Sequence, residues 1–305
     1  MDPSATPDSP KPTAGLPPVQ PPSGRFIAQL FVIPGLIILV LVLVMLAANF
    51  LVSREQDPSH FLTRLDSENA DIRWRAANDL AQVLKRGEPA ALRWKADPVF
   101  ALDLAERLEK SFKALVEQEK VIAAQIAKST DKNKHLQWRT LRTQRDHVSF
   151  LAAALGEFHF AAGAPVLCDM LRHDHSPDLK GNTLQRRMTL WALMNLGQNL
   201  KGYAAISTEK QQEIIAKLKE EAASAPPRAR GANTALHYID KSYAGDDIVK
   251  VHERLIETAK AEDQFLRKLV AMSFNFWDGP GVERTLLDLS NDNGHGTLLR
   301  VEEND

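Results

Sequence analysis

Few residues of this 305-residue chain stand at spacings that would carry chemistry. The tightest group of metal-binding types is His173-Asp174-His175, but a zinc site needs three or four ligands and no second cluster accompanies it. Residues 172–177 instead indicate a turn after a helix, where histidine is favoured near the negative end of the helix dipole. Cys168 is the only cysteine, so it forms no internal disulfide, and its apolar neighbours favour a buried side chain.

Catalytic signatures are missing from the chain. The sequence has no P-loop, dinucleotide-binding fingerprint, nucleophile elbow or HExxH helix. Serine, histidine and acidic residues are plentiful, but no spacing singles out a triad. We therefore expect a protein that is not an enzyme and that uses no cofactor or metal. The alternative is a catalytic site assembled from residues that are distant in sequence.

The most informative charged stretch is basic and runs from residue 128 to residue 145. It carries six lysines and arginines against the single acid Asp131. It is a candidate patch for an acidic protein or for anionic lipid head groups, and the alternative is a solvated helix face. Trp94 and Trp138 are flanked by charges, so both are expected at a partner surface. The patch residues are Lys132, Lys134, Trp138, Arg139, Arg142 and Arg145.

These side chains must be positioned by helices, and a repeated pattern indicates where the helices lie. In this pattern an arginine is followed seven positions later by a large apolar residue, with small or aliphatic residues between them. It occurs at residues 73–80, 186–193 and 267–274, and copies without the arginine occur at 151–156 and 232–236. The residues that define the pattern are Arg73, Ala76, Ala77, Leu80, Leu155, Arg186, Leu193, Leu236, Arg267 and Phe274.

The spacing of the large apolar anchors is typical of helix-pair repeats. The last three intervals between anchors are 38, 43 and 38 residues, and the first is 75. Alanines allow a second helix to approach closely, and stacked pairs bury a continuous core. The doubled interval indicates a degenerate repeat or an insertion at residues 97–140. Partner helices are expected at 58–65, 165–171, 208–221 and 247–258.

The composition also favours an all-α domain. Its long stretches are rich in Ala, Leu, Lys, Glu, Gln and Arg, which are good helix formers, whereas aromatic residues make up only 7%. Lys and Arg together number 38 and Asp and Glu 39. This balance argues against a nucleic-acid-binding protein, which usually has a strong basic excess.

An uncharged segment precedes the repeats. Residues 1–25 form a Pro-rich tail that cannot bury a core and is expected to be disordered. Residues 26–53 carry no charge, and about 20 apolar residues span the hydrocarbon core of a bilayer. We expect one transmembrane helix here. The alternatives are a buried soluble helix and a cleaved signal peptide, whose apolar region is usually shorter.

Residues 69–77, Asn-Ala-Asp-Ile-Arg-Trp-Arg-Ala-Ala, resemble the start of the second helix of a HEAT repeat. Residues 148–156 and 187–197 are similar to the same helix. The whole arrangement resembles uncharacterised bacterial proteins that have one membrane helix and a HEAT-repeat domain. The resemblance implies an armadillo-like α-solenoid of about five to six helix pairs over residues 54–292, followed by a C-terminal tail at 293–305. It also implies that the repeated arginines bond carboxylates or carbonyls between adjacent repeats.

HEAT arrays are typically scaffolds and protein-binding surfaces, although the fold does not name a partner. We therefore expect a single-pass membrane-anchored scaffold or adaptor that binds another protein and no nucleic acid. The alternatives are a HEAT-like enzyme of the lyase or glycosylase type and a structural protein that self-associates through its anchor. Positive charge counts on the two sides of residues 26–53 are close. Arg25 beside the apolar segment favours a cytoplasmic N-terminus and a periplasmic solenoid.

Overall fold

The computed structural model describes residues 32–46, 58–126, 131–173, 182–261 and 263–291, and it gives the backbone alone for residues 126, 131–137 and 182–183. Within these residues the protein is all-α and has no strand, as the composition predicts. The chain divides into two compact units, Met1–Glu55 and Gln56–Asp305.

The described part of the first unit is a helix over residues 32–46. Its large apolar side chains are all exposed. Among the described helices of the protein, none combines the length and the apolar character needed to cross a bilayer. The remainder of the predicted anchor at 26–53, the Pro-rich tail at 1–25 and the tail at 293–305 lie outside the described residues.

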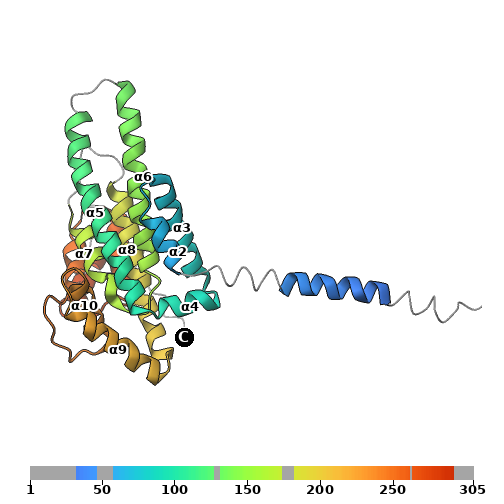
Figure 1. Ribbon diagram of the computed structural model, residues 1–305. Coiled ribbons are helices and arrows are strands. Elements are labelled where there is room, and N and C mark those ends of the chain that lie inside the picture. Colours follow the sequence, from blue (N-terminus) through green and yellow to red (C-terminus); the bar gives the residue numbers. More distant parts are fainter. Residues whose placement is uncertain (1–31, 47–57, 127–130, 174–181, 262, 292–305) are drawn as a thin grey trace, which may run out of the picture. The chain divides into compact units, whose positions relative to one another are not determined.

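The described part of the second unit is built of helices (Figure 1). Its elements are α2 (Pro58–Leu65), α3 (Ala70–Arg86), α4 (Pro89–Lys95), α5 (Pro98–Ile126), α6 (Asp131–Leu155), η1 (Ala161–Gly163), α7 (Ala164–Arg172), α8 (Asn182–Asn199), η2 (Leu200–Ala205), α9 (Thr208–Ala222), α10 (Arg228–Ile239), α11 (Val251–Thr258), α12 (Gln264–Ser273) and α13 (Val282–Asn291).

Four of these helices form one row. Helix α3 contacts α6, α6 contacts α8, and α8 contacts α12. A second layer covers one side of the row, because α2 packs on α3, α5 on α6, α7 on α8 and α11 on α12. Each helix of the row carries one copy of the repeated pattern. The partner helices expected at 58–65, 165–171 and 208–221 are confirmed, and the one expected at 247–258 begins later, at Val251.

The pair α9–α10 departs from this row. Helix α10 packs on α9, α5 and α7, while α12 contacts α8 directly. The pattern copy at residues 232–236 therefore forms a buried helix, but it lies against the second layer. Arg228 at the start of α10 fixes this position, because its Nη1 lies 2.5 Å from Asp103 on α5 and its Nε lies 2.7 Å from Glu221 on α9.

The doubled interval between the first two anchors contains α4 and most of a long helical hairpin. Helices α5 and α6 have 29 and 25 residues, and their distal ends stand clear of the other helices of this unit (Figure 1). The described part of residues 97–140 thus forms the arms of the hairpin and not a separate repeat. The five predicted anchors all lie in the core: Leu80, Leu155 and Leu193 are fully buried, Leu236 is 2% exposed and Phe274 is 6% exposed.

Close packing within the row predicts a strong effect at Gly156. A Cβ atom on this residue would lie 2.8 Å from the carbonyl oxygen and 3.2 Å from the Cα of Ala192. Because both atoms belong to the α8 backbone, α6 and α8 must separate to admit a methyl group. Gly156→Ala should therefore lower the free energy of unfolding by about 2–3 kcal/mol in urea titrations. A Gly156→Ala variant as stable as the unmodified protein would contradict this account.

Candidate protein-interaction surface

The predicted basic patch lies along α6, and its described side chains do not form one continuous surface. Arg139 and Arg142 are exposed to solvent. Trp138 is half-buried and packs against the core. The side chains of Lys132 and Lys134 lie outside the described residues. Among the patch residues, exposed positive charge is therefore seen at two arginines.

Arg145, the last residue of the predicted patch, points into the protein. It is 9% exposed, and its Nε and Nη2 each lie 2.9 Å from Oε1 of the buried Glu119 on α5. His173, from the candidate metal cluster, has its Nε2 3.9 Å from the other oxygen of Glu119. Asp174 and His175 lie outside the described residues. Within the described ranges, no three potential ligands gather as a metal site would require.

Cys168 is fully buried, as its apolar neighbours predict. Burial raises the pKa of its thiol to about 12. Because the thiolate is the nucleophilic form, this side chain is chemically inert at neutral pH.

Two of the repeated arginines bind the connection that precedes their own helix. Nη1 of Arg73 donates to the carbonyl oxygens of Ser67 and Glu68 at 2.7 and 2.8 Å. Nη1 of Arg267 donates to the carbonyl of Ala261 at 2.8 Å, also six residues upstream. These arginines therefore fix the entry of the chain into α3 and α12. Carbonyl bonds of the kind implied by the HEAT resemblance are present, but these three lie within a repeat and not between repeats.

The link between repeats is made by a neighbouring arginine that the sequence pattern did not single out. Nη2 of Arg187 on α8 lies 2.8 Å from Oδ2 of Asp263, and its guanidinium lies 4.6 Å from the centre of the Phe265 ring. Asp263 also caps α12, because its Oδ1 accepts the N–H of Leu266 at 3.0 Å. One carboxylate thus caps one helix and joins it to the next. Nε of Arg186 is buried without a partner among the described residues.

The side of the row that the described second layer leaves open carries exposed apolar side chains. Trp74 of α3 stacks on Phe150 of α6, and Arg187 of α8 lies over Phe265 of α12, so the exposed residues around these contacts lie on neighbouring helices of the row. Trp191, Phe265 and Met272 are 47%, 45% and 51% exposed. Trp74 and Phe150 are half-buried, and their rings stack at 6.4 Å. We call this surface the row face, and it comprises Trp74, Arg75, Arg139, Arg142, Phe150, Arg187, Trp191, Phe265, Lys268 and Met272.

Positive charge surrounds these aromatic rings. The Arg75 guanidinium lies 5.8 Å from the centre of the Trp74 ring, in addition to the contact of Arg187 with Phe265. The row face holds four arginines and Lys268, and the acids beside it are Asp71, Asp146 and Asp263. Cations therefore outnumber acids on this face, although the whole chain has a net charge of -1.

Sequence reasoning selected the wrong tryptophan for this surface. Trp94 is 7% exposed and packs edge-on against Phe61 and Phe100, so its expected exposure is wrong. Trp191 is the most exposed of the five tryptophans, although its sequence neighbours are apolar. The signal for its exposure lies in helical spacing, because Leu184 and Trp191 are seven residues apart on the side of α8 opposite its buried stripe.

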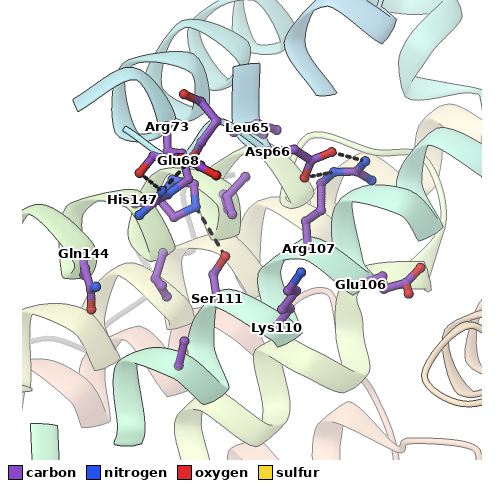
Figure 2. A pocket seen from close by; sticks show the side chains of 14 residues that line it. Leu65, Asp66, Glu68, Arg73, Glu106, Arg107, Lys110, Ser111, Gln144 and His147 are labelled. Carbon is purple, nitrogen blue, oxygen red and sulfur yellow. Dashed lines mark hydrogen bonds and ion pairs between the residues drawn. The ribbon is translucent and has the colours of Figure 1, made fainter. Parts of the chain in front are cut away.

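A separate pocket of about 610 Å³ lies between the α2–α3 connection, α3, α5 and α6 (Figure 2). Arg107 of α5 closes one side with a two-point ion pair to Asp66, at 3.0 and 2.7 Å. Ser111 Oγ lies 3.3 Å from Nε2 of His147. The α6 residues that line the pocket lie on the side of that helix away from Arg142 and Phe150, so the pocket is distinct from the row face.

Within the described residues, the Ser111–His147 pair lacks the features of a hydrolytic triad. A triad needs a carboxylate on Nδ1 of the histidine, and here Nδ1 has no partner among the described residues. Burial, followed by the positive charge of Arg73, lowers the pKa of His147 to about 4, which makes it a weak base. Ser111 also lies inside α5, where backbone N–H groups are used by the helix and supply no oxyanion hole.

Acid should destabilise the protein through His147. The unfolded chain binds this proton near the ordinary pKa of 6.5, whereas the folded protein binds it only near 4. The folded state is therefore favoured above pH 6.5, and up to about 3 kcal/mol of stability is lost as the pH falls toward 4. His147→Gln should flatten this part of the dependence in urea unfolding at neutral pH and at pH near 4. Some slope should remain, because the pKa values of His159 and His252 are also lowered by burial.

No family model matches this chain, and no curated protein matches it either. The row face and the pocket are therefore interpreted from their own geometry and charge.

Proposed function

We propose that the protein is a membrane-anchored scaffold whose HEAT-like α-solenoid, residues 54–292, binds another protein through the row face. The observation that carries this proposal is the set of exposed aromatic and methionine side chains on neighbouring helices of the row. Exposed apolar residues that gather on one face and are bordered by polar ones mark interaction sites. Aromatic residues, methionine and arginine are also the types enriched in protein interfaces.

The arrangement of helix pairs supports a solenoid. The pairs α2–α3, α5–α6, α7–α8 and α11–α12 present one helix each to the row, and each row helix contacts the next. One helix pair cannot bury its apolar face alone, so successive pairs share a continuous core. In such an array, α9–α10 and the long arms of α5–α6 are additions to the regular repeats.

The charge of the row face indicates the chemistry of the partner. Its cations outnumber its acids, and Arg75 and Arg187 each lie over an aromatic ring. An occupant must therefore supply carboxylates for the cations and large apolar side chains to cover Trp191 and Met272. An acidic amphipathic segment of another protein has both properties.

The anchor is supported by the helix at residues 32–46. Val32, Ile33, Leu36 and the large apolar side chains that follow are 46–74% exposed within their own unit. Burying such a side chain is worth about 1.5–3 kcal/mol, so water is an unfavourable environment for this segment and a bilayer is a favourable one. Full-length protein should stay with membranes after alkaline extraction, and a variant lacking residues 26–53 should not. Release of the full-length protein would contradict the anchor.

Site-specific crosslinking in cells tests the scaffold. A photoreactive residue at position 191 or 272 should capture the same protein, and the captured segment should be acidic and apolar. A photoreactive residue in place of Leu92 on α4, which is 51% exposed and outside the row, is the matched control. Met272→Ser combined with Lys268→Gln removes an apolar side chain and a cation from the row face without touching the Arg187–Asp263 bond, and this double variant should abolish capture at position 191.

The outcomes separate the alternatives. Capture of one protein from both row positions but not from position 92 supports the scaffold. Capture of a second copy of this chain would replace it with the self-associating structural protein. Equal capture from row and control positions, or none from the row, would refute binding through the row face.

A further inference from the structure

The pocket beside α5 contains positive charge that the described residues do not neutralise. Nη1 of Arg73 donates hydrogen bonds to two backbone carbonyls, and Arg73 forms no ion pair within the described part of the chain. Lys110 lines the same pocket, is exposed, and has no side-chain partner among the described residues. Arg107 differs, because Asp66 neutralises it. Two of the three cations around this pocket are therefore available to a ligand.

The pocket is lined by three acids and three cations, and all three acids are exposed to solvent. Asp66 is occupied by Arg107. Glu106 is half-exposed and lies 3.6 Å from Arg228, which it shares with Asp103 and Glu221. Glu68 is exposed at the rim, and its backbone carbonyl, not its carboxylate, is the group that meets Arg73. Solvent screens the exposed acids more strongly than it screens the half-buried Arg73.

Polar groups in the wall of the pocket are also unsatisfied. His147 is 7% exposed, and its Nδ1 makes no well-aligned hydrogen bond among the described residues, although the backbone of Arg73 lies near enough to raise its pKa slightly against the effect of burial. Oε1 of Gln144 is likewise buried without a partner among the described residues, and rotation of this amide would present its NH₂ group instead. Buried polar groups are normally hydrogen-bonded, so unsatisfied ones that line a cavity point to a missing partner. Figure 2 shows Arg73, Ser111 and Lys110 around the same space.

We propose that this pocket binds an oxyanion, either a carboxylate of an acidic peptide or a free phosphate, through Lys110, Arg73 and Ser111. Both sources offer oxygens that accept hydrogen bonds from ammonium, guanidinium and hydroxyl groups, and charge-assisted bonds of this kind are the stronger ones. The site lies on the other side of α6 from the row face, so it goes beyond the scaffold function and does not depend on it.

An anion bound in the pocket should change the pKa of His147. The charges and titratable groups around the pocket come from α3 (Arg73), α5 (Glu106, Arg107, Lys110) and the α2–α3 connection (Asp66, Glu68). The positive charge of Arg73 contributes to the lowered pKa of His147. An anion beside Arg73 offsets that charge, so the pKa of His147 rises when the site is filled and the ligand binds more tightly as the pH falls.

Binding measurements on the full-length protein in detergent test the site. The probes are a labelled short peptide of alternating glutamate and serine, the same peptide with glutamine in place of glutamate, and inorganic phosphate. Lys110→Gln should weaken binding of the glutamate peptide about tenfold, as expected when one charge-assisted contact is lost. Lys113→Gln is the matched control, because Lys113 is 74% exposed on the same helix and does not line the pocket, and its effect should stay within about twofold.

Each outcome has a definite meaning. Glutamate-peptide binding that depends on Lys110 supports the site with a peptide carboxylate as its ligand. Phosphate binding with the same dependence, and no peptide binding, supports it with free phosphate as the ligand. Equal weakening by both lysine variants, binding of neither probe, or a His147 pKa that does not rise on binding would overturn it. Trp191→Ser should leave these affinities unchanged, so failure here is distinguishable from failure of the row face.

Discussion

Trp277→Ala should lower the free energy of unfolding by about 4 kcal/mol. The indole is 1% exposed, and its Nε1 donates to the carbonyl of Leu193 on α8 at 2.8 Å. Its ring lies edge-on to Tyr238 on α10 at 4.9 Å, and a Cβ built on Gly197 would lie 2.7 Å from it. One side chain therefore joins the row to the α9–α10 pair, so its removal leaves a cavity where two substructures meet.

Equilibrium unfolding in urea, followed by far-ultraviolet circular dichroism, measures this loss. Trp277→Phe should retain most of the packing and cost less, because it removes mainly the hydrogen bond and part of the ring. Trp191→Ala is the matched control, since this tryptophan is 47% exposed on α8 and should change stability by under about 1 kcal/mol. A similar loss for Trp191→Ala and Trp277→Ala would show that burial does not decide the energetics of these side chains.

Local sequence signals predicted the helices of the row well. The two repeated arginines with described bonds each stand four residues after a helix-capping side chain, at Asn69 before Arg73 and at Asp263 before Arg267. Asn182 precedes Arg186 at the same interval, but it is the first residue of α8 itself. In α3 and α12 the repeated unit is therefore a cap followed by an arginine that binds the preceding connection. Such a unit is encoded within a few residues, which is why the sequence reveals it.

The position of α9–α10 has a different origin, and the repeat spacing misled the prediction. Spacing near 40 residues places this pair between α8 and α12, but α12 packs directly on α8. The pair is held instead by contacts across long sequence distances, since Arg228 binds Asp103 and Arg230 binds Asp169. Repeat spacing in a sequence does not predict which distant carboxylate an arginine will bind.

The pocket could not be predicted for the same reason. Its residues come from three segments near positions 66–73, 106–114 and 144–151, and none of these segments has a motif of its own. The basic patch, by contrast, is recognisable from the sequence of one helix, but the sequence alone does not show which of its side chains face solvent. Arg145 follows Arg142 by three residues, and this step is enough to turn it from solvent toward Glu119. Predicting the row face takes two kinds of information. One is the 3.6-residue period of each helix, and the other is which side of each helix its neighbours cover.

Lys95→Met should lower the free energy of unfolding by about 3–4 kcal/mol, since it leaves a buried carboxylate without its partner. Nζ of Lys95 lies 3.0 Å from Oε2 of Glu157, and the two side chains are only 8% and 12% exposed. The pair joins the end of α4 to the turn after α6, across 62 residues of sequence. Little water reaches Glu157 to replace the lost ammonium group.

A double replacement separates two contributions to the free energy of unfolding: the cost of leaving one buried charge without its partner, and the net stabilisation by the ion pair. Lys95→Met combined with Glu157→Leu removes both charges together. Desolvation of a buried ion pair offsets much of its attraction. The double variant should therefore be more stable than Lys95→Met alone by at least about 2 kcal/mol. Lys113→Met is the control at an exposed pair with Glu109, where a change under about 0.5 kcal/mol is expected. If the double variant is as unstable as Lys95→Met, the loss comes from the packing of the lysine stem, and α4 is held by its apolar contacts and not by this ion pair.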